Sequence, residues 1–398
     1  MKRIIKYGIA IFLLSLASLT FAIDTGFELT NKAGWKNTGD ADGFTDHKAT
    51  FWVTVPFNNA NTTSLSVEGS LYASKPANDT FKFYADLDLF RFSLVPYAGD
   101  GVKISMDAGR IPVSDVTGFI LNQNVDGADI HGSFKFGNVN FMAGYTGLLN
   151  ARKSGALMSV DDYADAAVTN AIYKIGSSRA IGKLTVQLPQ LIGKTDLIFE
   201  ATGQYDMRKY TKSDYDELVN TAYGTLSLSG PVTNILFYSV SGTYQTGTMT
   251  EKITDSSGSI NSVLGTVHFD LFPAAGNQMN AQFSYSPGEI GNFSVAGFIP
   301  ITFQQAGTLF TEGNRNLMKA SLGWNCNPMK QFNFDVGGKA FMYAKTPEGL
   351  NMYRGTEATG GATIKLTSDV KFRLDSAILF LYKQQIQYQA SLKAIITL

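Results

Sequence analysis

The chain has 398 residues, and 33 basic residues balance 33 acidic ones, so a basic surface suited to nucleic acid is not expected. Its 3 histidines and single cysteine lie far apart in the sequence, which excludes an intramolecular disulfide and gives no metal-ligand spacing. We therefore expect neither a metal nor another cofactor.

The N-terminus has the order of a secretory signal peptide. Lys2, Arg3 and Lys6 precede an apolar run over 7–19, and a small-residue cleavage site follows at 20–22. The apolar run is shorter than the roughly 20 residues of a membrane-spanning helix, which disfavours an uncleaved anchor. We expect residues 1–22 to be removed and residues 23–398 to form one exported domain.

The exported part alternates apolar and polar residues over segments of roughly ten residues. Successive side chains of a strand point to opposite faces, so each segment has one apolar and one polar face. The clearest segments are 50–57, 64–73, 196–206, 331–342, 371–382 and 387–398. A water-soluble protein of this size would contain long apolar core segments instead. The pattern predicts an all-β fold, namely a transmembrane antiparallel up-and-down β-barrel with a wet lumen.

Turn-forming residues separate the segments, and short connections alternate with long ones. The short connections near 58–61, 137–138 and 229–232 are expected to be periplasmic turns. The longer stretches at 37–47, 112–126, 150–179, 207–217 and 247–259 are expected to be extracellular loops. A direct count gives roughly nineteen strands, whereas a barrel with both termini in the periplasm needs an even number. We expect about eighteen strands, or else about sixteen, with the miscount between Phe272 and Lys330.

The fifth predicted strand, 101–111, leads into a motif of a known family. The stretch Ala-Gly-Arg-Ile-Pro-Val-Ser-Asp at 108–115, followed by Asp-Gly-Ala-Asp at 126–129, resembles the Gly-Arg strand end and acidic loop of Gram-negative porins. The resemblance implies that the loop 112–126 folds into the lumen as a constriction, with Asp129 beside it, and that three copies form a trimer. Leu398 replaces the aromatic residue with which that family usually ends, and the overall pattern is also similar to that of spirochaete outer-membrane barrels.

Two arginines interrupt the alternation near this loop. Strict alternation along the fifth strand would place Arg110 on the lipid side, at a cost of about 2–4 kcal/mol at the bilayer midplane. A bulge at Gly109 would turn the side chain inward. Arg91 is likewise out of phase with Asp86 and Asp88 in the preceding strand. Either both arginines line the constriction, or both lie at the headgroup level with their guanidinium groups in water.

Charged residues with inward phase indicate a possible electric field across the lumen. The first strands and their loop supply acidic residues and the last strands supply basic ones. They are Glu68, Asp86, Asp88, Asp107, Asp115 and Asp126 against Lys339, Lys365, Lys371, Arg373 and Lys393. Acid on one wall opposite base on the other would filter polar solutes by size and dipole. Alternatively, the lumenal charges only hydrate the interior and pair with one another.

The longest predicted loop, 151–178, contains Asp161, Asp162 and Asp165 in an alanine-rich stretch. Clustered carboxylates could bind Ca²⁺, but their spacing does not match an EF-hand. A solvated loop helix is the favoured interpretation.

His131 and Ser133 have the spacing of the histidine and serine in the outer-membrane phospholipase. Their phase places them in the lumen, away from lipid, and the sequence contains no Gly-x-Ser-x-Gly elbow. We therefore expect that the protein is not an enzyme.

The favoured function is an outer-membrane porin, a water-filled channel for ions and small hydrophilic solutes. Its expected partners are outer-membrane lipid, the barrel-assembly machinery and two further copies of the chain. An occluded barrel that acts as an adhesin or receptor through its long loops is the first alternative, and an outer-membrane hydrolase is the second.

Overall fold

The computed structural model describes residues 23–39, 41–58, 62–76, 79–168, 171–208, 217–251, 256–291 and 294–398. The predicted signal peptide, 1–22, lies outside the described residues, so its removal stays a prediction. Within the described ranges, no helix is both long and apolar enough to span a membrane.

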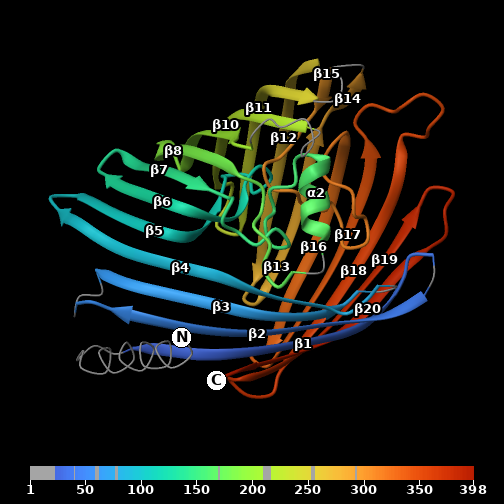
Figure 1. The fold of residues 1–398 in the computed structure, drawn as a ribbon, viewed down its shortest axis with the longest axis horizontal. Coiled ribbons are helices and arrows are strands. Elements are labelled where there is room, and N and C mark those ends of the chain that lie inside the picture. Colours follow the sequence, from blue (N-terminus) through green and yellow to red (C-terminus); the bar gives the residue numbers. More distant parts are fainter. Residues whose placement is uncertain are drawn as a thin grey trace.

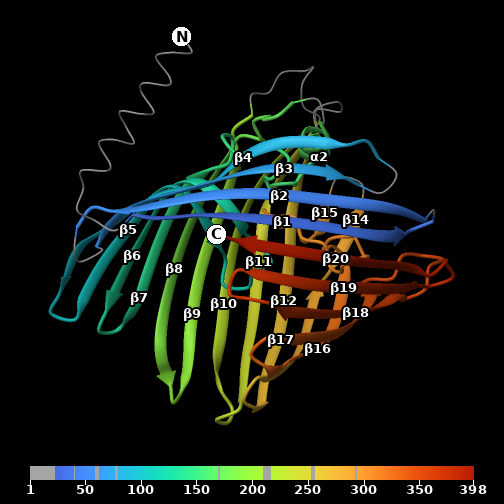
Figure 2. The same ribbon diagram turned by 90° about the horizontal axis from the view of Figure 1, so that it is seen from below.

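One antiparallel sheet curls into a closed barrel (Figures 1 and 2). Neighbouring strands of the wall pair in antiparallel register, and β1 pairs with β20 to close the ring. The wall strands are β1 (Asp24–Asn37), β2 (Ala41–Pro56), β3 (Thr63–Lys75), β4 (Lys82–Gly99), β5 (Val102–Ser114), β6 (Asn122–Phe134), β7 (Gly137–Tyr145), β8 (Arg179–Ile192), β9 (Thr195–Asp206), β10 (Glu217–Pro231), β11 (Leu236–Glu251), β12 (Ser256–Ala274), β13 (Asn277–Ser286), β16 (Leu317–Met329), β17 (Phe332–Tyr343), β18 (Tyr353–Lys365), β19 (Val370–Leu381) and β20 (Gln387–Thr397).

The wall of the barrel contains 18 strands, which confirms the expected number and the all-β class. The miscount between Phe272 and Lys330 has a structural cause. Two four-residue strands, β14 (Gly288–Gly291) and β15 (Ser294–Gly297), form a hairpin, and residues 298–316 then enter the barrel as a segment without regular secondary structure. We call residues 298–316 the inner segment. Since β13 pairs directly with β16, neither the hairpin nor the inner segment adds a strand to the wall.

Short and long connections lie at opposite ends of the barrel. Phe27 and Leu398 exchange backbone hydrogen bonds of 2.9 and 2.8 Å at the end with the short turns. At the other end, the expected loops at 37–47 and 247–259 are wrong in extent, because β2 begins at Ala41 and β12 resumes at Ser256. The strands continue there because ladder hydrogen bonds join backbone groups, whatever the polarity of the side chains.

The outer face of the barrel is apolar. Phe51, Leu322 and Leu374 are 54, 70 and 54% exposed and alternate with side chains that point into the lumen. This arrangement matches the expected inversion, in which apolar residues face lipid and polar residues face water.

One side of the lumen, however, is filled and dry. Inward-facing apolar residues of β7, β8, β10 and β12 pack against the tip of the β5–β6 hairpin and the inner segment, in a cluster that includes Met142, Ile181, Val219, Leu264 and Phe298. Figure 1 shows helix α2 (Val160–Ala167) and the inner loops gathered within the barrel outline. The wet lumen that the sequence predicts is therefore confined to the rest of the barrel, because the loops carry enough apolar side chains to exclude water from this side.

Candidate functional site

The open part of the lumen lies against β2, β3 and β4. A cavity of about 660 Å³ is lined there by these strands and by the loops that fold inward. Three acidic and three basic side chains face it, and they are Glu68, Asp86, Asp88, Lys48, Arg91 and Lys153. Uncharged polar groups come from Gln123, Asn124, Thr302 and Gln304. The cavity is therefore polar and of mixed charge.

A second cavity, of about 370 Å³, extends along the wall toward β19 and β20. Lys48, Tyr72 and Lys153 line both cavities, so the two adjoin each other. Tyr72 stacks on Tyr84 with ring centroids 4.6 Å apart, and the ammonium of Lys153 lies 3.9 Å from the centroid of the Tyr72 ring. Burial lowers the pKa of Lys153, although the carboxylate of Asp88 acts in the opposite direction. Lys153 thus places a cation between the two cavities.

The tip of the β5–β6 hairpin is one of the inward loops. The expected loop 112–126 is shorter in the structure, because β5 ends at Ser114 and β6 begins at Asn122, which leaves 115–121. The carboxylate of Asp115 accepts hydrogen bonds from the backbone N–H groups of Thr117, Ile120 and Leu121 at 2.8, 2.9 and 2.8 Å. Since Ile120 and Leu121 are fully buried in the apolar cluster, the turn is held inside the barrel.

The inner segment joins this tip to the β7–β8 loop. The N–H of Thr302 donates to the Ile120 carbonyl at 2.9 Å, and its hydroxyl oxygen accepts from the N–H of Asn122 at 3.0 Å. The N–H of Phe303 donates to the carbonyl of Gly155 in the β7–β8 loop at 2.7 Å. The three loops therefore form one connected layer at the cavity.

Arg110 lies at the point where β5 separates from β4. Gly109 precedes it with a φ of +116°, and a Cβ at Gly109 would lie 2.0 Å from the carbonyl oxygen of Phe90. Only glycine fits this backbone. Pairing between the two strands ends at Arg110, and the β7–β8 loop covers the free edge of β4, where the N–H of Ala85 donates to the Ile172 carbonyl at 3.2 Å.

The Arg110 guanidinium ties this junction together. Its Nε and Nη2 donate to the two carboxylate oxygens of Asp126 at 2.8 and 2.9 Å. Its Nη1 donates to the carbonyl of Leu87 on β4, and its Nη2 to the carbonyl of Leu148 in the loop, both at 2.8 Å. The side chain is buried in the wall, with Asp86 at 3.8 Å, and does not border the open cavity.

The phase change that the sequence indicates in β4 is present. The β3–β4 register shifts between Glu68 and Gly69, so Asp86 and Arg91 both face the lumen although they differ in alternation. Asp88 forms an ion pair with Lys48 at 3.1 Å. Arg91 lines the larger cavity, and its Nε is buried without a hydrogen-bond partner from the protein.

The remaining predicted charges are dispersed. Asp107 accepts a hydrogen bond from Ser93, Asp129 pairs with His131 at 3.1 Å, and Arg373 lies between Asp335 and Asp375 at 2.9 and 2.7 Å. Lys339 lies 3.6 Å from Glu357. Lys365 and Lys371 are backbone partners in the β18–β19 ladder. They flank the short turn after β18, at the end of the barrel with the chain termini.

The expected separation of acid and base onto opposite walls is not found in this arrangement. Because β1 pairs with β20, the first and last strands are neighbours at the seam of the barrel. Ion pairs such as Lys48–Asp88 and Arg373–Asp335 mix the two signs on the same part of the wall. The open side is lined by paired and unpaired charges of both signs.

A buried ionic cluster holds the β7–β8 loop against the wall. The expected helix in this loop is present as α2. It is exposed on one side, at Val160 and Tyr163, and is anchored on the other side by Asp162, which is only 2% exposed. Asp162 and Asp206 pair with the fully buried Arg179 at 2.7 and 3.1 Å. Burial raises the pKa of Asp162, but the positive charge of Arg179 and neighbouring hydrogen bonds outweigh it, so the net shift is downward. No group of three or more potential metal ligands occurs in the described ranges.

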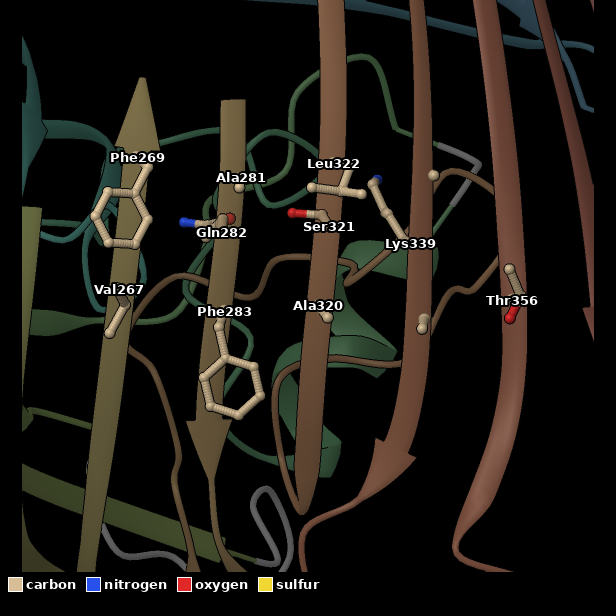
Figure 3. Close-up of a pocket in the computed structure, with 12 residues that line it drawn as sticks. Val267, Phe269, Ala281, Gln282, Phe283, Ala320, Ser321, Leu322, Lys339 and Thr356 are labelled. Carbon is tan, nitrogen blue, oxygen red and sulfur yellow. The ribbon is translucent and has the colours of Figure 1, made fainter. Parts of the chain in front are cut away.

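Two further cavities lie on the outer face of the wall. They measure about 500 and 780 Å³ and lie over β12, β13, β16 and β17, with Phe269, Ala281, Leu322 and Gly338 in both. Figure 3 shows Phe269, Phe283 and Leu322 standing on these strands, with the green helix behind the wall. Most of their lining is apolar, in contrast to the charged lumenal cavities.

The fold resembles that of several solved structures. The crystal structure of OpdK from Pseudomonas aeruginosa matches with a TM-score of 0.60 and 12% identity over 95% of this chain and 98% of that one. OccK11 (OpdR) from the same organism matches with a TM-score of 0.59 and 12% identity, over 94 and 96% of the two chains. The barrel shares its fold with these proteins. At this identity the likeness establishes the fold alone, and neither a protein-family model nor a curated protein sequence matches the chain.

Several residues of the site could not be singled out from the sequence. Tyr72 and Tyr84 are cross-strand partners in β3 and β4, and Lys153 reaches them only because a loop returns to the inner face of these strands. Glu357 lies in an ordinary alternating strand, and nothing in that pattern distinguishes it from other inward carboxylates. The one available signal was the Gly-Arg pair at 109–110, which marks the place where the hairpin bends inward.

Proposed function

We propose that this protein is an outer-membrane channel for the passive diffusion of ions and small hydrophilic solutes. The observation that carries the proposal is the pair of adjoining polar cavities inside a closed barrel whose outer face is apolar. A barrel of 18 strands is wide enough to leave an aqueous lumen, and here the loops narrow it without filling the side next to β1–β4.

The constriction is formed by the β5–β6 tip together with the inner segment and the β7–β8 loop. The hydrogen bonds of Thr302 and Phe303 join these three loops into one layer, and the cavity lies between that layer and β2–β4. Solutes pass along this wall, where Lys48, Arg91 and Lys153 face Glu68 and Asp88. The proposed path runs along one side of the lumen. The sequence predicted instead a pore narrowed by the loop 112–126 alone.

The chemistry of the cavity favours small polar organic solutes. Cations beside stacked tyrosine rings suit a planar anion, because the ring faces bury its apolar part while the cations attract its charge. One structural neighbour is described as OpdK with vanillate, an aromatic carboxylate. We include such anions among the solutes to be tested for this chain.

Single-channel recording tests the proposal. Refolded residues 23–398 in a planar bilayer should give stable ohmic steps, and aromatic carboxylates should reduce the current reversibly. A correctly folded, heat-modifiable barrel without conductance would contradict the channel and support the adhesin or receptor alternative.

The proposed cellular setting follows from the barrel. The chain is inserted into the outer membrane by the barrel-assembly machinery and is surrounded by lipid, and trimer formation is tested by the mass of the protein in mild detergent. A spirochaete origin stays a prediction from the sequence pattern. We propose no hydrolytic activity, because His131 pairs with Asp129 and Asn140 on the lumenal face, away from lipid substrate.

A further inference from the structure

The inner segment crosses the lumen from one wall to another. At its start, the N–H of Ile299 donates to Gln245 of β11 at 3.0 Å, and its carbonyl accepts from the Gln245 side chain at 2.9 Å. Its middle joins the β5–β6 tip through Thr302. Its far part, 306–310, lies against β17, β18 and β19. The inner segment is therefore held at both ends and in the middle, and we refer to it below as the bar.

Glu357 of β18 supports the far end of the bar. Its Oε1 accepts a hydrogen bond from the N–H of Thr308 at 2.8 Å. Its Oε2 accepts from the N–H groups of Leu309 and Phe310 at 2.7 and 3.0 Å. The carboxylate is completely buried, and Lys339 on the neighbouring strand lies 3.6 Å away. One wall side chain thus satisfies three consecutive backbone donors of the turn.

Apolar contacts assist this support but do not replace it. Phe310 stacks on Phe341 with ring centroids 4.1 Å apart, and Leu309 packs in the same buried cluster. Without the carboxylate, the three N–H groups would remain buried and unpaired unless the turn left the wall for water. Hydrophobic packing alone would then have to offset the free-energy cost of burying three unpaired N–H groups.

We propose that Glu357 is a positioning residue that sets the width of the channel by holding the bar in place. This inference rests on the proposed channel function. The bar carries Thr302, Phe303 and Gln304, which line the larger cavity. These residues are also bonded to the β5–β6 tip and the β7–β8 loop, so release of the far end removes one support of the whole layer. The layer can then shift away from β2–β4, and the passage widens.

The first test compares Glu357→Ala with Glu312→Ala in planar bilayers. Glu312 is a carboxylate of the same segment, but its side chain is 60% exposed and pairs with Arg354, so it controls for the loss of a charge. Glu357→Ala should increase the single-channel conductance and admit larger sugars in liposome swelling, while Glu312→Ala leaves both close to wild type. Equal conductance and size limits for Glu357→Ala and wild type would overturn the proposal.

A second readout does not depend on conduction. Phe310 is only 3% exposed, so chymotrypsin should not cleave after it in the wild type. In Glu357→Ala, cleavage there should be roughly tenfold faster or more, the factor for loss of one charge-assisted hydrogen bond. A wild type that is silent in bilayers, with this protease effect intact, would remove the channel function but keep Glu357 as the support of the bar.

A third variant tests the proposal if Glu357→Ala does not fold. Leu309→Pro removes one of the donated N–H groups from the bar and leaves the wall unchanged. It should reproduce the higher conductance, with heat-modifiable mobility like that of the wild type. A normal conductance in Leu309→Pro, together with lost protection at Phe310, would show that holding this end of the segment does not set the width.

Discussion

At the scale of single residues, the site depends on charged groups whose roles differ although their types are alike. Arg110 is surrounded by Asp126 and two backbone carbonyls, which makes it a structural cation at a junction of strands. Arg91 and Lys153 face the cavity, and Arg91 has an unpaired Nε. The structural role of Arg110 differs from that of Arg91 and Lys153 in burial and in hydrogen-bond partners. Residue type alone predicts neither the burial nor the partners.

Replacing Arg110 should destabilise the barrel. Arg110→Met leaves the carboxylate of Asp126 without its partner, and breaking a buried pair from one side costs about 3 kcal/mol. The temperature at which the protein loses its folded mobility on gels should fall, and the β7–β8 loop should become sensitive to protease. Arg110→Lys keeps the charge but not the two-pronged geometry, so an intermediate temperature is expected. Unchanged stability of both variants would contradict this role.

Replacing Lys153 should change ion preference with little effect on stability. Lys153→Glu puts a negative charge between the two cavities, so the reversal potential in a salt gradient should shift toward cations. Lys174→Glu is the control, since Lys174 belongs to the same loop but pairs with Asp165 and lines neither cavity. Equal shifts in both variants would show that the effect is not local.

The lowered pKa of Lys153 also predicts a pH dependence. An ammonium is charged below its pKa, so a lowered pKa means that the charge is lost before a free lysine, at about 10.4, would lose it. The permeability to anions relative to cations should therefore decline as pH rises toward that value, and the decline should be absent in Lys153→Met. A pH-independent reversal potential in the wild type would contradict the assignment.

At the scale of elements, the bend of the β5–β6 hairpin separates a narrowed barrel from an open one. Gly109 permits the bend, Asp115 closes the turn, and Ile120 and Leu121 bury it. The sequence indicates this bend through the Gly-Arg pair and the change of phase. It does not indicate where the tip lies in the barrel. That position depends on the hydrogen bond between Asn122 and Thr302 of the inner segment, which are 180 residues apart in the chain.

A side chain at Gly109 should prevent the bend. Gly109→Ala places a Cβ against the Phe90 carbonyl in a backbone conformation that alanine avoids, at a cost of about 1–3 kcal/mol or more. We expect a lower unfolding temperature and a less stable conductance level. Gly242→Ala is a matched control, because a Cβ there meets nothing within 4 Å. A Gly109→Ala protein as stable as Gly242→Ala would exclude a required left-handed backbone.

At the scale of the whole molecule, the two faces of the wall should respond oppositely to charge. Leu322→Arg puts a guanidinium into the apolar surroundings and should lower folding stability in lipid by about 2–4 kcal/mol if it lies near the midplane. Ser321→Arg, one residue away on the lumenal face, should fold normally and shift ion preference toward anions. Tolerance of both substitutions would place this part of the wall outside the bilayer.

The sequence by itself determined the barrel and the faces of its strands, because alternation is a local property of each strand. The strand number followed only to about eighteen or sixteen, and the structure decided it. It also marked the hairpin at 109–126 as the place where the wall changes direction. Only the tertiary structure decided which side of the lumen stays open, since that depends on contacts between loops far apart in the chain. Glu357 and Lys153 acquire their roles from such contacts, and no local pattern distinguishes an inward carboxylate that pairs with water from one that holds a loop.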